Sequence, residues 1–159
     1  MPDIPGIEHV ISSNEALDLA ELPKRLVVVG GGYIAVEFAN VFHGLGVETT
    51  LVYRGQEILG RFDMDMRRGL HEAMEKKGIR ILCQTIAEKV ERRADGRLDV
   101  HLSSGETLAV DQAMLALGRT PNSADLGLEA AGVELGKTGE IIVDPFSRTS
   151  VDNIWAIGD

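Results

Sequence analysis

The sequence predicts an α/β fold in which a parallel sheet with crossover helices carries a three-stranded antiparallel β-meander. Over residues 24–83, apolar runs of strand length alternate with amphipathic helical stretches. A glycine-rich turn at 30–32 connects the first of these runs to a helix. Between 88 and 110, three short segments are separated by Asp95-Gly96 and Ser104-Gly105, which favour tight turns. These three observations together favour one mixed α/β domain.

The first half of the chain is predicted to be a lead-in followed by alternating strands and helices. Residues 1–23 form the lead-in, with a short helix after Ser12, because Ser12 and Glu15 have the spacing of a capping box. The elements that follow are a strand at 26–29, a helix at 33–45 ending at Gly46, a strand at 47–53, a helix at 63–77 ending at Gly78, and a strand at 79–83.

Sulfur-containing residues in this half are predicted to serve packing. Met66, Leu70 and Met74 recur every four residues, which places them on one helix face toward the core. We interpret the methionines as core filler rather than ligands, and expect no metal site. Cys83 is the one cysteine, so an internal disulfide or redox pair is excluded, and its position in an apolar strand indicates a buried thiol.

The second half begins with the meander and ends in glycine-rich loops. Its strands are expected at 88–92, 98–102 and 107–110, and a further apolar strand at 113–117. Beyond Gly118 the sequence predicts loops at 123–140 with a turn of helix near 128–131, a short strand at 141–143 and an apolar segment at 154–157.

Composition restricts the possible partners. The 159 residues suit one domain, and a formal net charge of −9 argues against nucleic acid. We find neither a signal peptide nor an apolar run of membrane length, so the sequence predicts a cytoplasmic protein without a membrane partner.

The glycine turn predicts a Rossmann-like dinucleotide-binding domain. Gly30 can make the tight turn after the strand, and Gly32 lets a pyrophosphate approach the backbone. The N-terminus of the following helix offers free N–H groups and a positive dipole end to the phosphates. Ala35 holds the third position of the fingerprint, where a methyl group still permits close packing of helix on strand.

The second strand indicates which dinucleotide is bound. Proteins that take NAD usually carry an acid about 20 residues after the glycines, where it binds the ribose 2′-OH. Here the strand ends in Tyr53-Arg54, and Arg61 follows in the same loop. An arginine near the ribose accommodates a 2′-phosphate, so the sequence predicts NADPH as the cofactor.

Four segments together resemble the pyridine-nucleotide–disulfide oxidoreductase family (class I), and within it the glutathione reductases. They are GGGYIAVEFA at 30–39, YRGQEILGRFD at 53–63, ALGRTPN at 116–122, and the C-terminal segment 149–159, which is similar to the second flavin motif of the family. One departure concerns the second arginine. Some relatives place it before a glycine, whereas this chain has Gly60-Arg61, so Arg61 is expected to contribute less than Arg54.

The resemblance implies a role for each matching residue. The NADPH contacts would come from Gly30, Gly31, Gly32, Tyr33, Ile34, Glu37, Arg54, Arg61 and Gly118. Tyr33 would cover the flavin until the nicotinamide displaces it, and Glu37 would contact the nicotinamide amide and pair with a lysine on the flavin side. Asp159 would bind a ribityl hydroxyl of FAD.

The resemblance also implies a longer parent enzyme. Residues 1–23 would lead in from its FAD domain, 24–147 would form the NADPH-binding domain, and 148–159 would begin the return to the FAD domain. The parent would be a homodimer that passes hydride from NADPH to FAD, then electrons to a cysteine pair and on to glutathione disulfide, in cell redox homeostasis. The redox-active cysteine pair and the dimer domain lie outside this sequence, so the chain alone is not expected to turn over.

Two alternatives stay open at this point. Trypanothione reductase or another NADPH-dependent flavoprotein disulfide reductase would share the same motifs, because the residues that bind the disulfide lie outside this chain. A nucleotide-sensing Rossmann module without a redox role is the other, although the flavin-like C-terminal segment argues against it.

Overall fold

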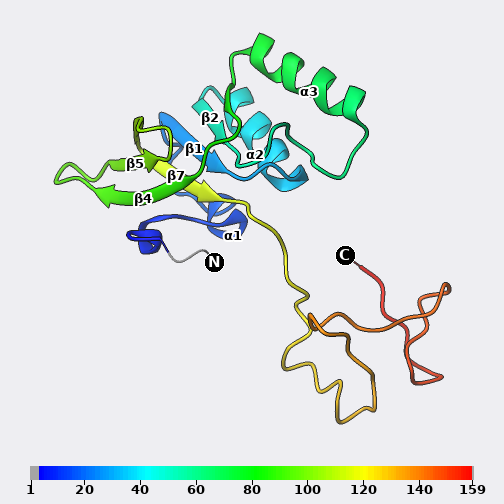
Figure 1. The fold of residues 1–159 in the computed structure, drawn as a ribbon. Coiled ribbons are helices and arrows are strands. Elements are labelled where there is room, and N and C mark those ends of the chain that lie inside the picture. The colour runs from blue at the N-terminus through cyan, green and yellow to red at the C-terminus, as the bar shows by residue number, and fades with distance from the viewer. Residues whose placement is uncertain (1–3, 159) are drawn as a thin grey trace. The chain divides into compact units, whose positions relative to one another are not determined.

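The computed structural model describes residues 4–158, and it divides into two compact units, Met1–Gly118 and Arg119–Asp159 (Figure 1). A four-stranded parallel sheet forms the centre of the first unit, in the order β3-β2-β1-β7. Its strands are β1 (Arg25–Val29), β2 (Glu48–Val52), β3 (Arg80–Leu82) and β7 (Gln112–Leu115). Within the described lead-in, Ile11 forms a parallel bridge with Met114 and so extends this sheet beyond β7.

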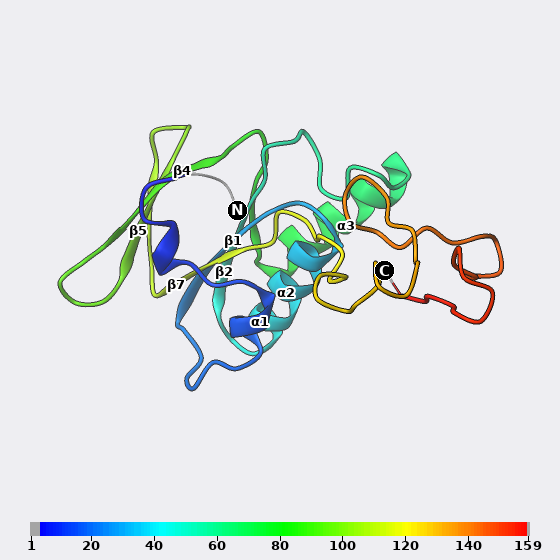
Figure 2. The ribbon, with the colours of Figure 1, turned by 90° about the horizontal axis from the view of Figure 1, so that it is seen from below.

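The two faces of the parallel sheet are covered by different layers. One face packs on α2 (Tyr33–Gly44) and α3 (Met64–Lys77), and its core includes Leu26 and Val28. The other packs on the meander through the alternate side chains Val27 and Val29. Figures 1 and 2 show the helices and the meander on opposite sides of β1. Burial on both faces is why β1 is apolar without alternation, as parallel strands usually are.

The predicted meander is confirmed. Strands β4 (Ala87–Arg92), β5 (Leu98–Leu102) and β6 (Thr107–Val110) pair antiparallel in the order β4-β5-β6. Gly96 and Gly105 take positive φ angles of 86° and 84° in the two turns, which a glycine adopts without steric cost. On β5, buried and half-buried residues alternate because one face of the meander lies on the parallel sheet.

The capping box predicted at Ser12 and the helix stop predicted at Gly78 are confirmed, and Asp63, predicted as the first helical residue, is instead the N-cap of α3. The short helix α1 (Ser13–Ala16) has a complete capping box, in which the Ser12 N–H donates to Glu15 Oε2 at 2.7 Å. Helix α3 begins after Asp63, whose carboxylate accepts from the Asp65 N–H at 3.0 Å, and ends at Gly78 with φ 104°. A single 3₁₀ turn, η1 (Ile7–His9), precedes α1.

Two predictions about α3 and its surroundings need correction. Met74 is 1% exposed and Leu70 packs partly against the core, but Met66 is 70% exposed. The core contacts of α3 therefore come from its second half. The periodicity predicted the correct face of the helix, but it did not show that this face is exposed near the N-terminus. Cys83 lies one residue beyond β3 and is half-buried rather than inside a buried strand.

The second unit is built from turns; the predicted turn of helix forms, whereas the strand predicted at 141–143 does not form in residues 119–158. A backbone bond from Ala131 N–H to the Gly127 carbonyl, 3.1 Å, closes one turn at the expected helix. At the expected strand, a single bridge joins Leu135 to Ile141, because no longer partner segment runs beside it. No helix among the described residues is long and apolar enough to cross a membrane.

Candidate dinucleotide-binding site

The carboxyl edge of the parallel sheet gathers most of the predicted site residues of the first unit. The chain leaves β1 toward β2 and β3 on one side and returns as β7 on the other, so the topological switch point lies beside β1. Ligands of open α/β sheets bind at this point, outside the carboxyl ends of the strands. Gly30–Gly32 follow β1, Tyr53-Arg54 follow β2, and Ala116–Gly118 follow β7.

Gly30 occupies a position that only glycine fits. Its φ is 147°, and a Cβ there would lie 2.3 Å from the Ala116 carbonyl oxygen. Its N–H donates to the Val52 carbonyl at 2.9 Å, which binds the turn to β2. The methyl group of Ala35, at the third fingerprint position, would be 3.2 Å from that same Cβ. The turn is therefore packed closely between β2, β7 and the first turn of α2.

Gly31 has a packing role that the sequence alone did not indicate. A Cβ on Gly31 would come within 2.3 Å of the Tyr53 ring, and one on Gly55 within 2.5 Å of the same ring. The Gly31 carbonyl also accepts from the Leu59 N–H at 2.6 Å. The ring of Tyr53 thus fits against two glycines, and the loop after β2 is held on the glycine turn.

Gly32 leaves the beginning of α2 open. It is the N-cap residue and has no side chain to cap the helix, so the N–H groups of the first turn have no partner in the helix. Gly32 is exposed, and no described heavy atom outside its chain neighbours lies within 4 Å of its Cβ position. An anionic group can therefore approach these N–H groups directly.

Tyr33, Ile34 and Glu37 lie on the first turns of α2. Tyr33 is 43% exposed, Glu37 is exposed and Ile34 is half-buried, whereas Ala35 and Val36 face the core. Tyr33 and Glu37 are one helical turn apart and share the exposed face. None of the described residues forms an ion pair or side-chain hydrogen bond with Glu37.

The loop after β2, residues 53–63, carries both predicted arginines. Arg54 and Arg61 are exposed, and neither has an ion pair or side-chain hydrogen bond with a described residue. In a chain of net charge −9, two unneutralised guanidinium groups on one loop favour an anionic ligand there. Gly118, with φ 145°, lies at the end of the first unit, and Asp159 lies outside the described residues.

Arg67 anchors this loop, a role that its sequence position did not reveal. From α3, its Nε donates to the Ile58 carbonyl at 2.7 Å and an Nη to the Glu57 carbonyl at 2.8 Å. Ile58 is fully buried, and the Gly55 carbonyl accepts from the Gln84 N–H at 2.9 Å. The loop is thus fixed before any ligand binds.

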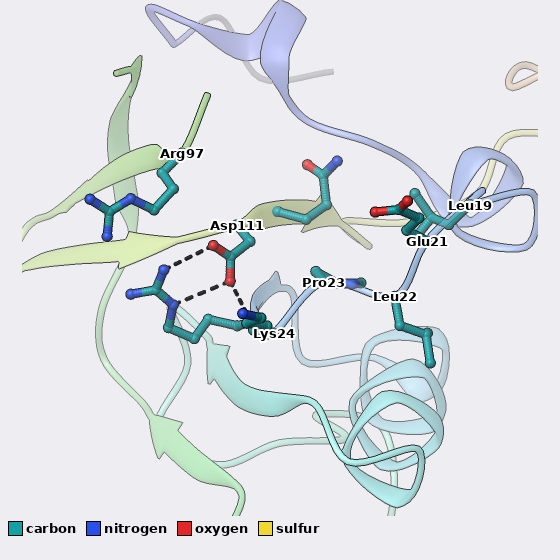
Figure 3. A pocket seen from close by; sticks show the side chains of 9 residues that line it. Leu19, Glu21, Leu22, Pro23, Lys24, Arg97 and Asp111 are labelled. Carbon is teal, nitrogen blue, oxygen red and sulfur yellow. Dashed lines mark hydrogen bonds and ion pairs between the residues drawn. The ribbon is translucent and has the colours of Figure 1, made fainter. Parts of the chain in front are cut away.

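A hollow of about 500 Å³ lies at the amino edge of the sheet, away from the glycine turn (Figure 3). In its wall, the Arg25 guanidinium binds both carboxylate oxygens of Asp111, at 2.8 and 3.2 Å. This hydrogen bond holds the pKa of Asp111 below its usual range. Two of the cations that line the hollow, Arg25 and Arg97, are thus already paired with carboxylates, those of Asp111 and Asp95.

Comparison with known proteins gives concordant results. A model of the pyridine nucleotide-disulphide oxidoreductase family matches residues 1–159. The chain is 48% identical to the trypanothione reductase of Trypanosoma congolense, covering 100% of this chain and 33% of that protein. It is 43% identical to the chloroplastic/mitochondrial glutathione reductase of Pisum sativum, and the match covers 100% of this chain and 29% of that protein. The solved structure of the HOCl-induced flavoprotein disulfide reductase RclA from Escherichia coli superposes with a TM-score of 0.85 at 36% sequence identity. This match covers 100% of this chain and 37% of the RclA chain. The chain therefore spans about a third of these relatives.

Proposed function

This chain belongs to the pyridine nucleotide-disulphide oxidoreductase family, and on that premise we propose that it is the NADPH-binding domain of a flavin-dependent disulfide reductase. We further propose that the parent enzyme reduces glutathione disulfide and is a cytoplasmic homodimer. In that parent, 24–147 would form the NADPH-binding domain, while 1–23 and 148–159 would belong to the FAD domain.

The observation that carries the proposal is the loop with Arg54 and Arg61. Both guanidinium groups are exposed and without ion-pair partners among the described residues, on a loop bound to the glycine turn through the Leu59–Gly31 hydrogen bond. No carboxylate stands at the end of β2, where an NAD-binding protein would place one. A ligand with a pyrophosphate and a second phosphate beyond it matches this distribution of donors.

The residues of this chain would bind and orient the dinucleotide. The N–H groups at the start of α2, beside the open space at Gly32, would accept the pyrophosphate, and Arg54 would bind the 2′-phosphate with Arg61 in support. Tyr33 and Glu37, on the exposed face of α2, would border the nicotinamide. When bound, NADPH supplies the hydride that the parent would pass on through FAD and a cysteine pair.

We expect NADPH to bind more tightly than NADH. A hydrogen bond to a charged group contributes roughly 1.5–3 kcal/mol, so one arginine would give a preference of about ten-fold to 150-fold, and two would give up to several thousand-fold after the entropic cost of ordering both side chains is subtracted. Calorimetric titration of the chain with each nucleotide measures the ratio. Equal affinities for the two would overturn the coenzyme assignment while leaving the family membership intact.

Trypanothione disulfide is the second candidate substrate, and sequence identity favours it. The two trypanothione reductases compared are 48% and 46% identical to this chain, against 43% and 42% for two glutathione reductases. Steady-state assays of the parent enzyme with both disulfides distinguish the two by the ratio of kcat/KM. A ratio in favour of trypanothione disulfide would replace the first proposal with the second.

Glu37→Gln is expected to leave the stability of this chain nearly unchanged, within about 0.5 kcal/mol, because the side chain is exposed and has no partner among the described residues. In the parent enzyme the same change should slow flavin reduction by NADPH, which stopped-flow absorbance follows. Asp111→Asn is the contrast: it breaks a part-buried pair with Arg25 and should lower the thermal midpoint. A large loss of stability in Glu37→Gln would show a structural role instead.

A further inference from the structure

We propose that Glu57, His71 and Cys83 form a binding site for a transition-metal dication, with Zn²⁺ as the ion it suits best. One ligand atom from each residue, a carboxylate oxygen, a ring nitrogen and the thiol sulfur, lies within 4.8 Å of the other two. The site is separate from the glycine turn and does not depend on the proposed coenzyme. The sequence did not predict it, because the three residues are spaced without a recognisable metal motif.

Three different segments bring these ligands together. Glu57 belongs to the loop after β2, His71 to the middle of α3, and Cys83 follows β3. His71 Nδ1 and Glu57 Oε1 are already in direct contact, and their side chains are only 18% and 16% exposed. Cys83 is half-buried and packs against the core. The donors are therefore sheltered and held by independent parts of the fold before a metal arrives.

The charge around the cluster favours a cation. The half-buried Cys83 thiol has the carboxylates of Glu57 and Glu75 and the guanidinium of Arg67 as its charged neighbours. The Arg67 guanidinium is bound to the carbonyls of Glu57 and Ile58. Glu75 Oε1 lies 3.7 Å from His71 Nε2, the ring nitrogen that does not contact Glu57, and adds negative charge at the exposed rim. A dication would compensate these carboxylates and the thiolate that forms on binding.

The ligand set matches the coordination chemistry of zinc. Zn²⁺ accepts sulfur, nitrogen and oxygen ligands at about 2.3, 2.0–2.1 and 2.0–2.2 Å, in a tetrahedron. Ligand atoms of such a tetrahedron lie roughly 3.3–3.7 Å apart, so the cluster needs side-chain adjustment and no rearrangement of the backbone. Binding would take the thiol proton from Cys83 and release it to solvent, while His71 would ligate as a neutral imidazole through Nδ1 with its N–H proton on Nε2.

Co²⁺ titration of the chelator-treated chain tests the proposal. We expect one equivalent to bind and to produce the near-ultraviolet charge-transfer band of a cobalt–thiolate bond together with the strong visible bands of tetrahedral Co²⁺; Zn²⁺ should then displace it. Cys83→Ser should abolish the thiolate band, and His71→Gln should weaken binding at least ten-fold. Glu72→Gln is the matched control, because Glu72 lies on the same helix, is exposed and pairs only with Lys76 among the described residues.

A second measurement uses the unaltered chain and so does not depend on whether a variant folds. Because Cys83 is the one cysteine, its rate of reaction with a thiol reagent reports this site alone. One equivalent of Zn²⁺ should slow that rate at least ten-fold and raise the thermal midpoint, by roughly 5–10 °C when free Zn²⁺ is about 100-fold above its Kd. Unchanged thiol reactivity, or Co²⁺ binding that survives in Cys83→Ser without change, would overturn the proposal.

Discussion

Replacing Arg54 by glutamate is expected to lower the affinity for NADPH by about 100-fold or more and to narrow or reverse the preference over NADH. The change removes a charge-assisted hydrogen bond of roughly 1.5–3 kcal/mol and places a carboxylate where it repels a 2′-phosphate. A ribose 2′-OH can instead donate to that carboxylate, so NADH should bind as well as before or better. Calorimetry with both nucleotides measures the two affinities.

Arg92→Glu is the matched control for this prediction. Arg92 is exposed at the end of β4, and no ion pair joins it to any residue that the structure describes. Both substitutions replace one positive by one negative charge and take the formal net charge from −9 to −11. At physiological salt, Arg92→Glu is expected to lower the affinity for NADPH only about two-fold, because its charge acts over a long, screened distance. The loss of NADPH affinity in Arg61→Glu should lie between those of Arg54→Glu and Arg92→Glu. A greater loss in Arg61→Glu than in Arg54→Glu would make Arg61 the principal ligand of the 2′-phosphate.

Gly30→Ala is expected to destabilise the chain by roughly 2–6 kcal/mol, a large part of the stability of an ordinary domain. The estimate combines about 1–3 kcal/mol for a residue held at an unfavourable backbone angle with about 1–3 kcal/mol for overpacking. Here φ is 147°, and the new methyl group would lie 2.3 Å from the Ala116 carbonyl oxygen, which is backbone and cannot turn away. Urea unfolding followed by circular dichroism measures the loss.

Alanine substitutions at two other glycines are expected to change either the stability of the chain or its affinity for NADPH, but not both. Gly69→Ala, in the exposed middle of α3, should stabilise the chain by about 0.5–1 kcal/mol, because no described atom other than those of its chain neighbours and of the nearby helix backbone lies within 4 Å of the added carbon. Gly32→Ala should leave stability nearly unchanged, because φ is −83° and the space is open, yet weaken NADPH binding at least ten-fold by filling the approach to the helix N–H groups. Equal NADPH affinity in Gly32→Ala would argue against pyrophosphate binding at this turn.

Local signals in the sequence were sufficient for most of the fold. The capping box at Ser12, the N-cap Asp63 and the glycine stop at Gly78 delimit helices through bonds between residues close in the chain, so they can be read without a tertiary structure. Alternation along β5 similarly reported a half-buried strand. The predicted strand at 141–143 failed because a strand needs a partner, and the sequence does not show whether one lies beside it.

In the candidate site, too, some features could be predicted from local sequence and others only from the tertiary structure. The glycines of the turn and the arginines of the following loop could be identified from the sequence, because their chemistry depends on residue type and on spacing along one βαβ unit. The reason that Gly31 must lack a side chain is the ring of Tyr53, and the reason that the arginine loop is rigid is Arg67. Both contacts join different elements of the fold: Gly31 and Tyr53 are 22 residues apart, and Arg67 reaches from α3 to carbonyls nine and ten residues earlier.

By itself, then, the sequence determined the strand–turn–helix that presents backbone N–H groups, the cationic loop and the family, since each is encoded in short, contiguous patterns. Only the tertiary structure decided how deeply each side chain is buried and which distant groups meet. Met66 became exposed and Met74 buried on the same helix face, and Glu57, His71 and Cys83 came within 4.8 Å of one another. The burial of these side chains and the distances between them depend on how the loop after β2, α3 and β3 pack together. Helical periodicity in the sequence does not predict that packing.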